Sequence, residues 1–484
     1  MLHVSRIFEN AADVAPDAIA ATLDQDSLTF GDIELGANYI AHDMLHTGIG
    51  RGDRVLFWAD TSLAAIPIFA ACAKVGAVFA PLNARVSLEE VLPVAELAQA
   101  KVVLGSSEAQ GDPAGQLAAR LGIRDRLEGA PDIEGPRPRP NVDLDERDPH
   151  VIFFTSGSTG RPKGVVLSHR TNWLRTFVGA TSTPGGGGTV CMFPLFHMAG
   201  WTIALGAWQA RRPVHFVRVP DAPTLLETTA RHHAARLYCI PAVWGRILEH
   251  GVAGYDLTAL VEADTGTSAT PPDLLAAIKQ ALPNTTTRVF YGSTEAGPSL
   301  SLGDRDLFRK PGSVGVAQPS VEVRIDERGE VCVRSPFLMD GYFNDPDATA
   351  EALADGWYHT GDLGALDDDG YVSIVGRARD VIRTGGETVA PPEVEAVVGS
   401  HPDVAEVAVV GVPDPQWGEV VTAVIVTRAG SSPVTVEELR AFCSGRLAAF
   451  KQPRRVATVA SLPRTAATGQ IQRPLIVEQL QQGG

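Results

Sequence analysis

Short apolar runs alternate with amphipathic stretches along the first 150 residues of the chain. Residues 54–59 and 77–80 are compact apolar runs that predict strands, whereas residues 31–46 and 61–75 repeat apolar positions at helical spacing. Residues 102–105 predict another strand. Strands separated by helices are typical of parallel sheets that helices cover. The pattern therefore predicts an α/β fold with parallel-rich sheets.

The pattern changes after Val321, where short apolar runs are separated by turn-forming residues. Residues 322–325, 330–334 and 371–375 predict strands of a small antiparallel or barrel-like subdomain. After Asp380 helices and strands alternate again, which predicts a separate, smaller α+β domain. Its expected helices are residues 392–399 and 436–447, and its expected strands are residues 404–411 and 420–427.

Composition and charge narrow the class of protein. Hydrophobic residues make up 44% of the chain and charged residues 20%, as is ordinary for a globular protein. A formal net charge of −16 without a basic stripe argues against nucleic acid as a partner. The apolar stretch 63–80 is interrupted by Pro67, Lys74 and Gly76, so we expect a helix and a strand there and no membrane span.

The cysteines are scattered along the chain, at Cys72, Cys191, Cys239, Cys332 and Cys443. None forms a CxxC pair, so the spacing indicates neither a zinc site nor a disulfide framework. Cysteines without such a framework fit a reducing, cytoplasmic compartment. The N-terminus lacks the apolar core of a signal peptide, which agrees with that localisation.

A glycine-rich segment follows the apolar strand predicted at residues 151–154. It reads Thr155, Ser156, Gly157, Ser158, Thr159, Gly160, Arg161, Pro162, Lys163 and Gly164. Its glycines let backbone N–H groups approach a polyanion, its hydroxyls add donors, and Lys163 adds a positive charge. The spacing is not that of a Walker A loop. The alternative is a Ser/Gly-rich surface turn, but the place directly after an apolar strand favours a phosphate-binding loop.

Two later segments carry residues that suit a nucleotide. The first, residues 291–295, consists of Tyr291, Gly292, Ser293, Thr294 and Glu295. Tyrosine can stack on a base, threonine can bond phosphate, and a carboxylate can hold Mg²⁺. The second, residues 358–362, ends in Asp362, whose carboxylate can accept both ribose hydroxyls. Taken alone, the first segment is more typical of a turn after a strand, and the second is also a plausible hairpin turn.

The order and combination of these motifs resemble the adenylate-forming superfamily, which includes acyl-CoA synthetases, peptide-synthetase adenylation domains and luciferases. The resemblance spans nearly the whole chain and rests on residues 155–164, 194–197, 291–295, 358–362 and 376–387. It implies that Tyr291 flanks adenine, that Thr294 contacts the α-phosphate, that Glu295 helps to bind Mg²⁺, and that Asp362 and Arg377 grip the ribose.

The segment Pro194-Leu195-Phe196-His197 resembles the family's aromatic motif, which borders the acyl and pantetheine sites. A histidine beside phenylalanine is often a packed core residue, but this context places His197 in the active site without fixing its role. Gly200 and Trp201 line or border the acyl pocket, together with Gly292, or else pack in the core. Small residues at 265–268, without an obvious counter-charge, favour an apolar carboxylic acid as substrate.

The resemblance also implies two domains that move relative to each other. They are an N-terminal domain for AMP and the acyl group, residues 1–379, and a mobile C-terminal lid, residues 380–484, with Asp380 as the hinge. In the family, the lid alternates between a pose for adenylation and a pose for attack by CoA. The segment Gly385-Gly386-Glu387 would swing in to help form the pantetheine tunnel. ATP or acyl-AMP, coenzyme A and Mg²⁺ are thus the implied cofactors.

One residue departs from the family pattern. The family's C-terminal motif reads roughly P-R-T-x-T-G-K, and its lysine drives adenylation, but this chain has Gln470 after Thr-Gly. A neutral amide lacks the charge that stabilises phosphoryl transfer, a loss of about 10²–10³ in rate. Lys451, which lies in an ordinary family segment, is the only other lysine after Asp380. An extra alanine at 466–467 that alters the loop, or a laboratory Lys→Gln change, are the remaining explanations.

The sequence therefore predicts a ligase-type enzyme that forms acyl-CoA from an acyl-adenylate and CoA, with weak or absent ATP-dependent adenylation. A separate adenylating enzyme would then supply the adenylate, which suggests specialised metabolism. Three alternatives stay open: a complete ATP-dependent acyl-CoA ligase, an adenylation enzyme that loads a carrier protein, and a non-catalytic adenylate-binding protein. Neither the carboxylic acid nor the oligomeric state follows from the sequence.

Overall fold

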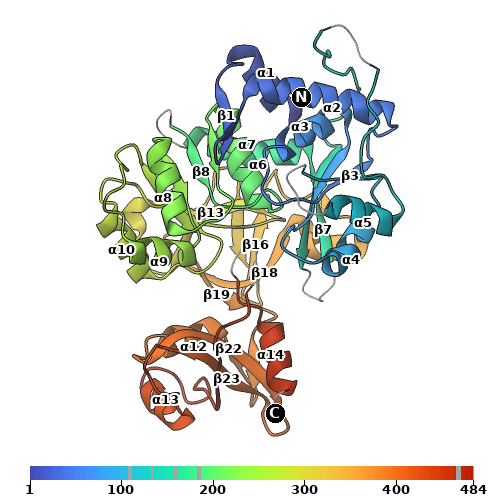
Figure 1. Ribbon diagram of the computed structural model, residues 1–484. Coiled ribbons are helices and arrows are strands. Elements are labelled where there is room, and N and C mark those ends of the chain that lie inside the picture. The colour runs from blue at the N-terminus through green and yellow to red at the C-terminus, as the bar shows by residue number, and fades with distance from the viewer. Residues whose placement is uncertain (107–111, 132–134, 157–161, 183–186, 465–469, 483–484) are drawn as a thin grey trace. The chain divides into compact units, whose positions relative to one another are not determined.

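The computed structural model describes residues 1–106, 112–131, 135–156, 162–182, 187–464 and 470–482 (Figure 1). The chain divides into two compact units. The larger comprises Met1–Glu322 and Val333–Tyr358, and the smaller comprises Val323–Cys332 and His359–Gly484. This is the predicted mixed α/β fold with a large N-terminal and a smaller C-terminal domain. The domain boundary expected at Asp380 stays a prediction.

One sheet of the larger unit has six strands, in the order β17-β7-β6-β4-β3-β5. Strands β3, β4, β5 and β6 pair in parallel, as the alternation of strands and helices predicts, and β7 and β17 are antiparallel additions. The strands are β3 Arg54–Phe57, β4 Val78–Pro81, β5 Val102–Leu104, β6 Pro149–Ser156, β7 Pro162–Ser168 and β17 Gly341–Tyr342.

A second run of paired strands in the larger unit follows the order β14-β13-β12-β11-β10-β8-β9-β1-β2. Neighbours from β12 to β1 are parallel, whereas β2, β13 and β14 pair antiparallel. The strands are β1 Ile19–Leu23, β2 Asp26–Thr29, β8 Thr189–Cys191, β9 Val214–Phe216, β10 Arg236–Tyr238, β11 Glu262–Gly266, β12 Val289–Ser293, β13 Gly297–Leu302 and β14 Ser313–Ala317.

One hydrophobic cluster joins both sheets of the larger unit to their helices (Figure 1). It includes Phe79 of β4, Val190 of β8 and Trp201 of α7, and the Trp201 ring stacks 4.0 Å from that of Phe69. Large aromatic side chains bury much apolar area, so this cluster is a main source of stability. The helices are α1 Ser5–Val14, α2 Phe30–His46, α3 Ala65–Val75, α4 Leu88–Ala98, α5 Pro113–Leu121, α6 His169–Ser182, α7 Met198–Gln209, α8 Ala222–Arg231, α9 Pro241–His250, α10 Pro272–Ala281 and α11 Pro346–Ala352.

The smaller unit contains four neighbouring strands and a separate sheet. The four, in the order β15-β16-β18-β19, are β15 Glu322–Ile325, β16 Glu330–Arg334, β18 Tyr358–Leu366 and β19 Val372–Arg377. The separate sheet has the order β21-β20-β23-β22, with β24 parallel to β23. Its elements are β20 Ile382–Thr384, β21 Glu387–Val389, α12 Pro391–Val398, β22 Val404–Asp414, β23 Gly418–Thr427, α13 Val436–Cys443, β24 Arg455–Thr458 and α14 Arg473–Gln482.

Helices cover both faces of this separate sheet. Val409 and Val421 pack in a cluster with α12 and α13, whereas Val410 and Val420 pack in another with α14. Successive side chains of a strand point to opposite faces, so each long strand supplies both clusters. The nearly continuous apolar runs of β22 and β23 thus reflect burial on two sides.

Several predicted elements end at different residues from those expected. The helix expected from residue 61 begins at Ala65, because Ser62 Oγ accepts a hydrogen bond from the N–H of Ala64 and forms a local turn. The helix expected to reach residue 447 ends at Cys443, because Ser444 is extended and Gly445 has a φ of +75°. The antiparallel prediction is confirmed for β18 and β19, and a barrel-like closure stays a prediction. Within the described part of the chain, no helix is long and apolar enough to cross a membrane.

Candidate active site

The hairpin of β6 and β7 holds both ends of the predicted phosphate loop. Thr155 lies opposite Lys163, and Ser156 lies opposite Pro162. The Nζ of Lys163 lies 4.6 Å from the ring centroid of Tyr342, within cation–π distance. The hairpin therefore fixes the base of the loop and the direction of its lysine. The predicted phosphate contacts Gly157, Ser158, Thr159 and Gly160 lie outside the described residues.

Tyr342 connects Lys163 with the predicted metal ligand Glu295. Its hydroxyl donates a hydrogen bond to Oε1 of Glu295 over 3.1 Å. Burial, and then the negative charge of Glu295, raises the pKa of Tyr342, so the hydroxyl keeps its proton and remains a donor. Sequence reasoning missed Tyr342. The only local signal is the preceding Gly341, whose φ of +145° favours glycine.

The predicted adenine and phosphate residues lie at the end of β12 and in the turn that follows it. A Cβ atom at Gly292 would lie 2.2 Å from the carbonyl oxygen of Gly297, so this close approach of β12 and β13 requires glycine. Ser293 Oγ accepts from the N–H of Ala296, and the carbonyl of Glu295 accepts from the N–H of Met339 over 2.7 Å. These bonds hold the backbone around Glu295 in one geometry.

The environment of Glu295 is suitable for Mg²⁺. Mg²⁺ takes oxygen ligands and usually keeps several waters, so one or two carboxylates are enough when phosphates supply the rest. The carboxylate of Glu295 is oriented by Tyr342, and Lys163 lies on the same side chain of Tyr342. The donor set therefore fits a magnesium ion that also contacts phosphate oxygens.

A buried arginine supports this turn from below. Arg175 of α6 is 0% exposed, and its Nη1 and Nη2 donate to the carbonyl oxygens of Thr294 and Phe337, over 3.0 and 2.8 Å. Burial lowers the pKa of Arg175 to about 10, while Asp340 and Glu295 oppose that change, so the guanidinium is charged at neutral pH. Sequence reasoning missed Arg175, because an arginine within a helical pattern is usually exposed.

Arg175→Met is expected to weaken AMP binding by about tenfold. The variant leaves two buried acceptors unpaired, each at a cost of about 1–3 kcal/mol, and about 1.4 kcal/mol is tenfold in affinity. Calorimetry with AMP measures the change, and thermal unfolding monitors the fold. Arg170→Met is the matched control, because Arg170 lies on the same helix but pairs with Glu146 near the surface. A loss of stability with unchanged AMP affinity would contradict a positioning role, and Arg175→Lys should recover part of the affinity.

Aromatic side chains connect the segment 194–197 with β12. The ring of Phe193 lies 5.6 Å from that of Tyr238, which lies 6.0 Å from that of Phe290. The Tyr238 hydroxyl lies 3.4 Å from Oγ1 of Thr267. These contacts join the residues predicted to border the acyl site, and their apolar character agrees with the expectation of an apolar acid.

His197 caps the N-terminus of α7. Its Nδ1 accepts a hydrogen bond from the N–H of Ala199 over 3.1 Å, and its ring stacks on Phe193 at 5.8 Å. Burial lowers the pKa of His197 to about 4, so the imidazole is neutral at physiological pH. Because Nδ1 accepts, the proton of the neutral ring lies on Nε2. The chemical role of His197 stays a prediction.

Gly200 and Trp201 pack α7 against the preceding segment. Trp201 is 1% exposed, and its Nε1 donates to the carbonyl of Leu195 over 2.6 Å. A Cβ atom at Gly200 would lie 2.9 Å from the carbonyl oxygen of Pro194. Core packing therefore accounts for Trp201, and the assignment of both residues to an acyl pocket stays a prediction.

In the smaller unit, Asp362 and Arg377 form the pair predicted at the ribose. They lie directly opposite each other on β18 and β19, and Arg377 Nε donates to Oδ1 of Asp362 over 3.0 Å. The N–H of Asp362 also donates to Oγ1 of Thr360 over 3.0 Å. Arg377 is 44% exposed, so this ion pair presents a carboxylate and a guanidinium at the surface of its unit.

The predicted hinge residue Asp380 belongs to an ion-pair network within the smaller unit. Its carboxylate lies 3.5 Å from Nη1 of Arg473 and 3.5 Å from Nε of Arg379. Arg473 also pairs with Glu395 over 2.6 Å. Asp380 is therefore tied by Arg473 to the C-terminal segment that carries Gln470. Its function as a hinge stays a prediction.

The segment with Gly386 and Glu387 is a tight β-hairpin. Thr384 and Glu387 pair across β20 and β21, and Gly385 and Gly386 between them have φ values of +59° and +85°. Two positive φ angles are typical of the two-residue turns that join twisted strands, and glycine adopts them without strain. The turn is exposed, as access to a cofactor requires, but its contact with CoA stays a prediction.

Gln470 lies at the base of a closed loop. Arg464 and Ile471 form an antiparallel bridge, and the N–H of Gln472 donates to the carbonyl of Pro463 over 2.9 Å. Lys451 is engaged elsewhere, because its Nζ lies 2.6 and 2.7 Å from the two carboxylate oxygens of Glu393.

Comparison with known proteins defines the class of protein. Residues 8–343 match the AMP-binding enzyme family and residues 393–468 match the AMP-binding enzyme C-terminal domain, so the chain belongs to the AMP-binding enzyme family. It is 31% identical to feruloyl-CoA synthase of Amycolatopsis sp, over 94% of this chain and 95% of the relative. It is 32% identical to the long-chain-fatty-acid–CoA ligase FadD13 of Mycobacterium tuberculosis, over 93% of both chains. The structure of the amide bond synthetase McbA from Marinactinospora thermotolerans is similar with a TM-score of 0.88 at 27% identity, over 99% of both chains.

Proposed function

We propose that this chain forms acyl-CoA, and that it starts from an acyl-adenylate and CoA far more readily than from a free acid and ATP. Membership of the AMP-binding enzyme family and similarity to feruloyl-CoA synthase and FadD13 support a ligase that uses ATP-derived adenylates and CoA. The observation that carries the second part is Gln470, a neutral amide where the family motif has lysine.

The missing charge matters for adenylation in particular. When a carboxylate attacks the α-phosphate, negative charge builds up on the phosphoryl oxygens, and a lysine ammonium would stabilise it. Gln470 supplies only a neutral donor, and Lys451 is held by Glu393. Lys163 and a Mg²⁺ ion at Glu295 would still bind phosphate. The adenylate can therefore be held, whereas its formation lacks one main cation.

Thioester formation needs no cation at position 470. The CoA sulfur attacks the acyl carbon, the thiol proton passes to solvent or a base, and AMP leaves with the electrons of the broken carbon–oxygen bond. Asp362 and Arg377 would hold the ribose of the leaving AMP. A separate adenylating enzyme as the source of the acyl-adenylate completes the proposal.

Parallel assays from both starting points test the proposal. We expect acyl-AMP plus CoA to give acyl-CoA at least about 10² times faster than acid plus ATP, Mg²⁺ and CoA, because one preorganised charge is missing. Synthetic adenylates of a hydroxycinnamic acid and of a long-chain fatty acid cover the two chemical classes that the relatives' names indicate. Chromatography measures acyl-CoA in each arm, and comparable rates from both starting points would contradict the proposal.

The relatives' names favour one other function, a complete ATP-dependent acyl-CoA ligase. That function predicts pyrophosphate release from acid and ATP at the rate at which acyl-CoA appears. Two further outcomes would identify the remaining alternatives: transfer of the acyl group to a carrier protein instead of CoA, or adenylate binding without any thioester product.

A further inference from the structure

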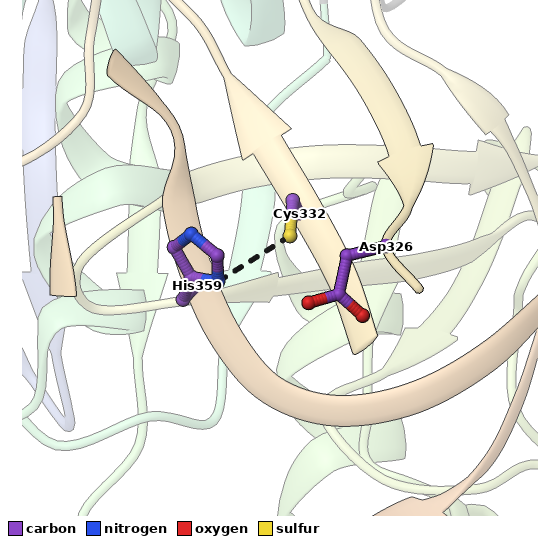
Figure 2. Close-up of side chains that lie close together, drawn as sticks. All are labelled: Asp326, Cys332 and His359. Atoms are coloured by element: carbon purple, nitrogen blue, oxygen red, sulfur yellow. Dashed lines mark hydrogen bonds between the residues drawn. The ribbon is translucent and has the colours of Figure 1, made fainter. Parts of the chain in front are cut away.

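Three metal-ligating side chains of different kinds meet in the smaller unit (Figure 2). Asp326 lies in the turn after β15, Cys332 lies on β16, and His359 lies near the start of β18. One ligand atom from each side chain lies within 4.8 Å of the other two. A fourth group is adjacent, because Oε2 of Glu330 lies 3.2 Å from Nδ1 of His359.

The separations between these atoms match those of ligands around one zinc ion. Zinc–sulfur bonds of about 2.3 Å and zinc–nitrogen bonds of about 2.0 Å at a tetrahedral angle place sulfur and nitrogen about 3.5 Å apart. The Sγ of Cys332 lies 3.5 Å from Nδ1 of His359. The same geometry places nitrogen and carboxylate oxygen about 3.3 Å apart, close to the distance between Glu330 and His359.

Burial and charge also favour a cation at this point. Cys332 is 0% exposed, and the side chains of His359 and Glu330 are 23% and 16% exposed. Burial, followed by the charges of Glu330 and Asp326, raises the pKa of the Cys332 thiol. Arg324 contacts the thiol as well. Two carboxylates and a thiolate carry three negative charges, which Arg324 and one divalent cation would neutralise in full.

We propose that Asp326, Cys332 and His359 bind one thiophilic divalent cation of the Zn²⁺ type, with Glu330 as the fourth ligand. A thiolate, an imidazole and carboxylates suit Zn²⁺, whereas Mg²⁺ and Ca²⁺ take oxygen ligands. Binding releases the thiol proton of Cys332 to solvent, because only the thiolate ligates the metal. The site is separate from the magnesium position at Glu295 and does not depend on the proposed function.

The cation would stabilise the strand that carries the candidate ribose carboxylate. Thr360 Oγ1 donates to the carbonyl of Val331, and the N–H of Gly361 donates to Oε1 of Glu330, both over 2.7 Å. Asp362 follows directly along β18. Joining the β15–β16 turn to His359 would therefore hold the start of β18 in place, so metal binding is expected to raise the thermal stability of the full chain.

Metal titrations of the full, metal-free chain without a polyhistidine tag test the site. Calorimetry with Zn²⁺ should show one strong site, and Co²⁺ should give the thiolate-to-cobalt charge-transfer band and the visible bands of a tetrahedral complex. Cys332→Ser should abolish the charge-transfer band. Asp326→Asn and His359→Gln should each weaken Zn²⁺ binding by at least about tenfold.

Two control variants keep the result specific. Glu327→Gln removes an exposed carboxylate from the same turn, and Cys443→Ser removes another buried thiol from the same unit, so both should leave the band unchanged. If Cys332→Ser does not fold, Asp326→Asn carries the test, because asparagine keeps the oxygen that accepts from the N–H groups of Arg328 and Glu330. No charge-transfer band in the unmodified chain, or unchanged Zn²⁺ affinity in Asp326→Asn and His359→Gln, would overturn the proposal.

Discussion

Gln470→Lys is expected to raise acid-dependent ATP–pyrophosphate exchange by about 10²–10³-fold, because one preorganised charge commonly contributes that much to the rate. The substitution returns an ammonium to the position that the family motif gives to lysine. The bridge between Arg464 and Ile471 holds the base of this loop, so the new side chain starts from a defined backbone. Thioester formation from supplied acyl-AMP should change little, since that step does not need the lysine.

Gln472→Lys is the matched control for this gain. It adds the same charge to the same segment, two residues further along, and so separates a specific effect of position 470 from a general effect of a more basic C-terminus. Radiolabelled pyrophosphate exchange measures adenylation in both variants. If folded Gln470→Lys protein shows no gain, the extra alanine at 466–467 has displaced the position, or another residue also prevents adenylation.

Sequence reasoning located the elements whose apolar patterns are local. The runs at 54–59, 77–80 and 102–105 predicted strands β3, β4 and β5, because strand and helix periodicities are visible within a few residues. The ends of helices were less certain. Ser62 at the start of α3 and Gly445 after α13 decide those ends through single hydrogen bonds or a single φ angle, which hydrophobic periodicity does not report.

Residues that act across long sequence separations were missed. Tyr342 meets Glu295 only because the short strand β17 pairs with β7, and Arg175 supports Thr294 from a helix 119 residues earlier. Neither residue lies in a segment that resembles a family motif as quoted from the sequence. Their importance follows from burial and from the specific carbonyl or carboxylate that each one contacts.

The candidate cation site shows the same limit from the opposite side. Cysteine spacing indicated no zinc site, because Cys332 has no neighbouring cysteine and His359 lies 27 residues away. The order β15-β16-β18 brings the two residues onto neighbouring strands. A ligand set assembled by strand pairing leaves no short motif, so only the three-dimensional arrangement suggests it.

Asp380→Pro is expected to reduce thioester formation by at least about 10²-fold while acyl-AMP binding stays largely intact. Proline fixes φ near −65° and removes the N–H that donates to the carbonyl of Arg377 over 3.0 Å, so it opposes a change of backbone state at this residue. Misplacement of reacting groups by about 1 Å can cost about 10² in rate. Thr294 and Asp362 precede position 380, so the predicted contacts with the adenylate should survive.

Asp380→Ala separates backbone restriction from the loss of an ion pair. Both variants remove the carboxylate that lies 3.5 Å from Arg473 and Arg379, but only proline restricts φ. Arg473 keeps its bond to Glu395 in either variant, so the C-terminal segment should stay attached. Calorimetry with acyl-AMP, timed chromatography of acyl-CoA and thermal unfolding are compared on the same preparations. A slow proline variant beside a nearly normal alanine variant supports rotation about residue 380, whereas equal losses assign the effect to the ion pair. Normal turnover in the proline variant means that thioester formation needs no backbone rotation there.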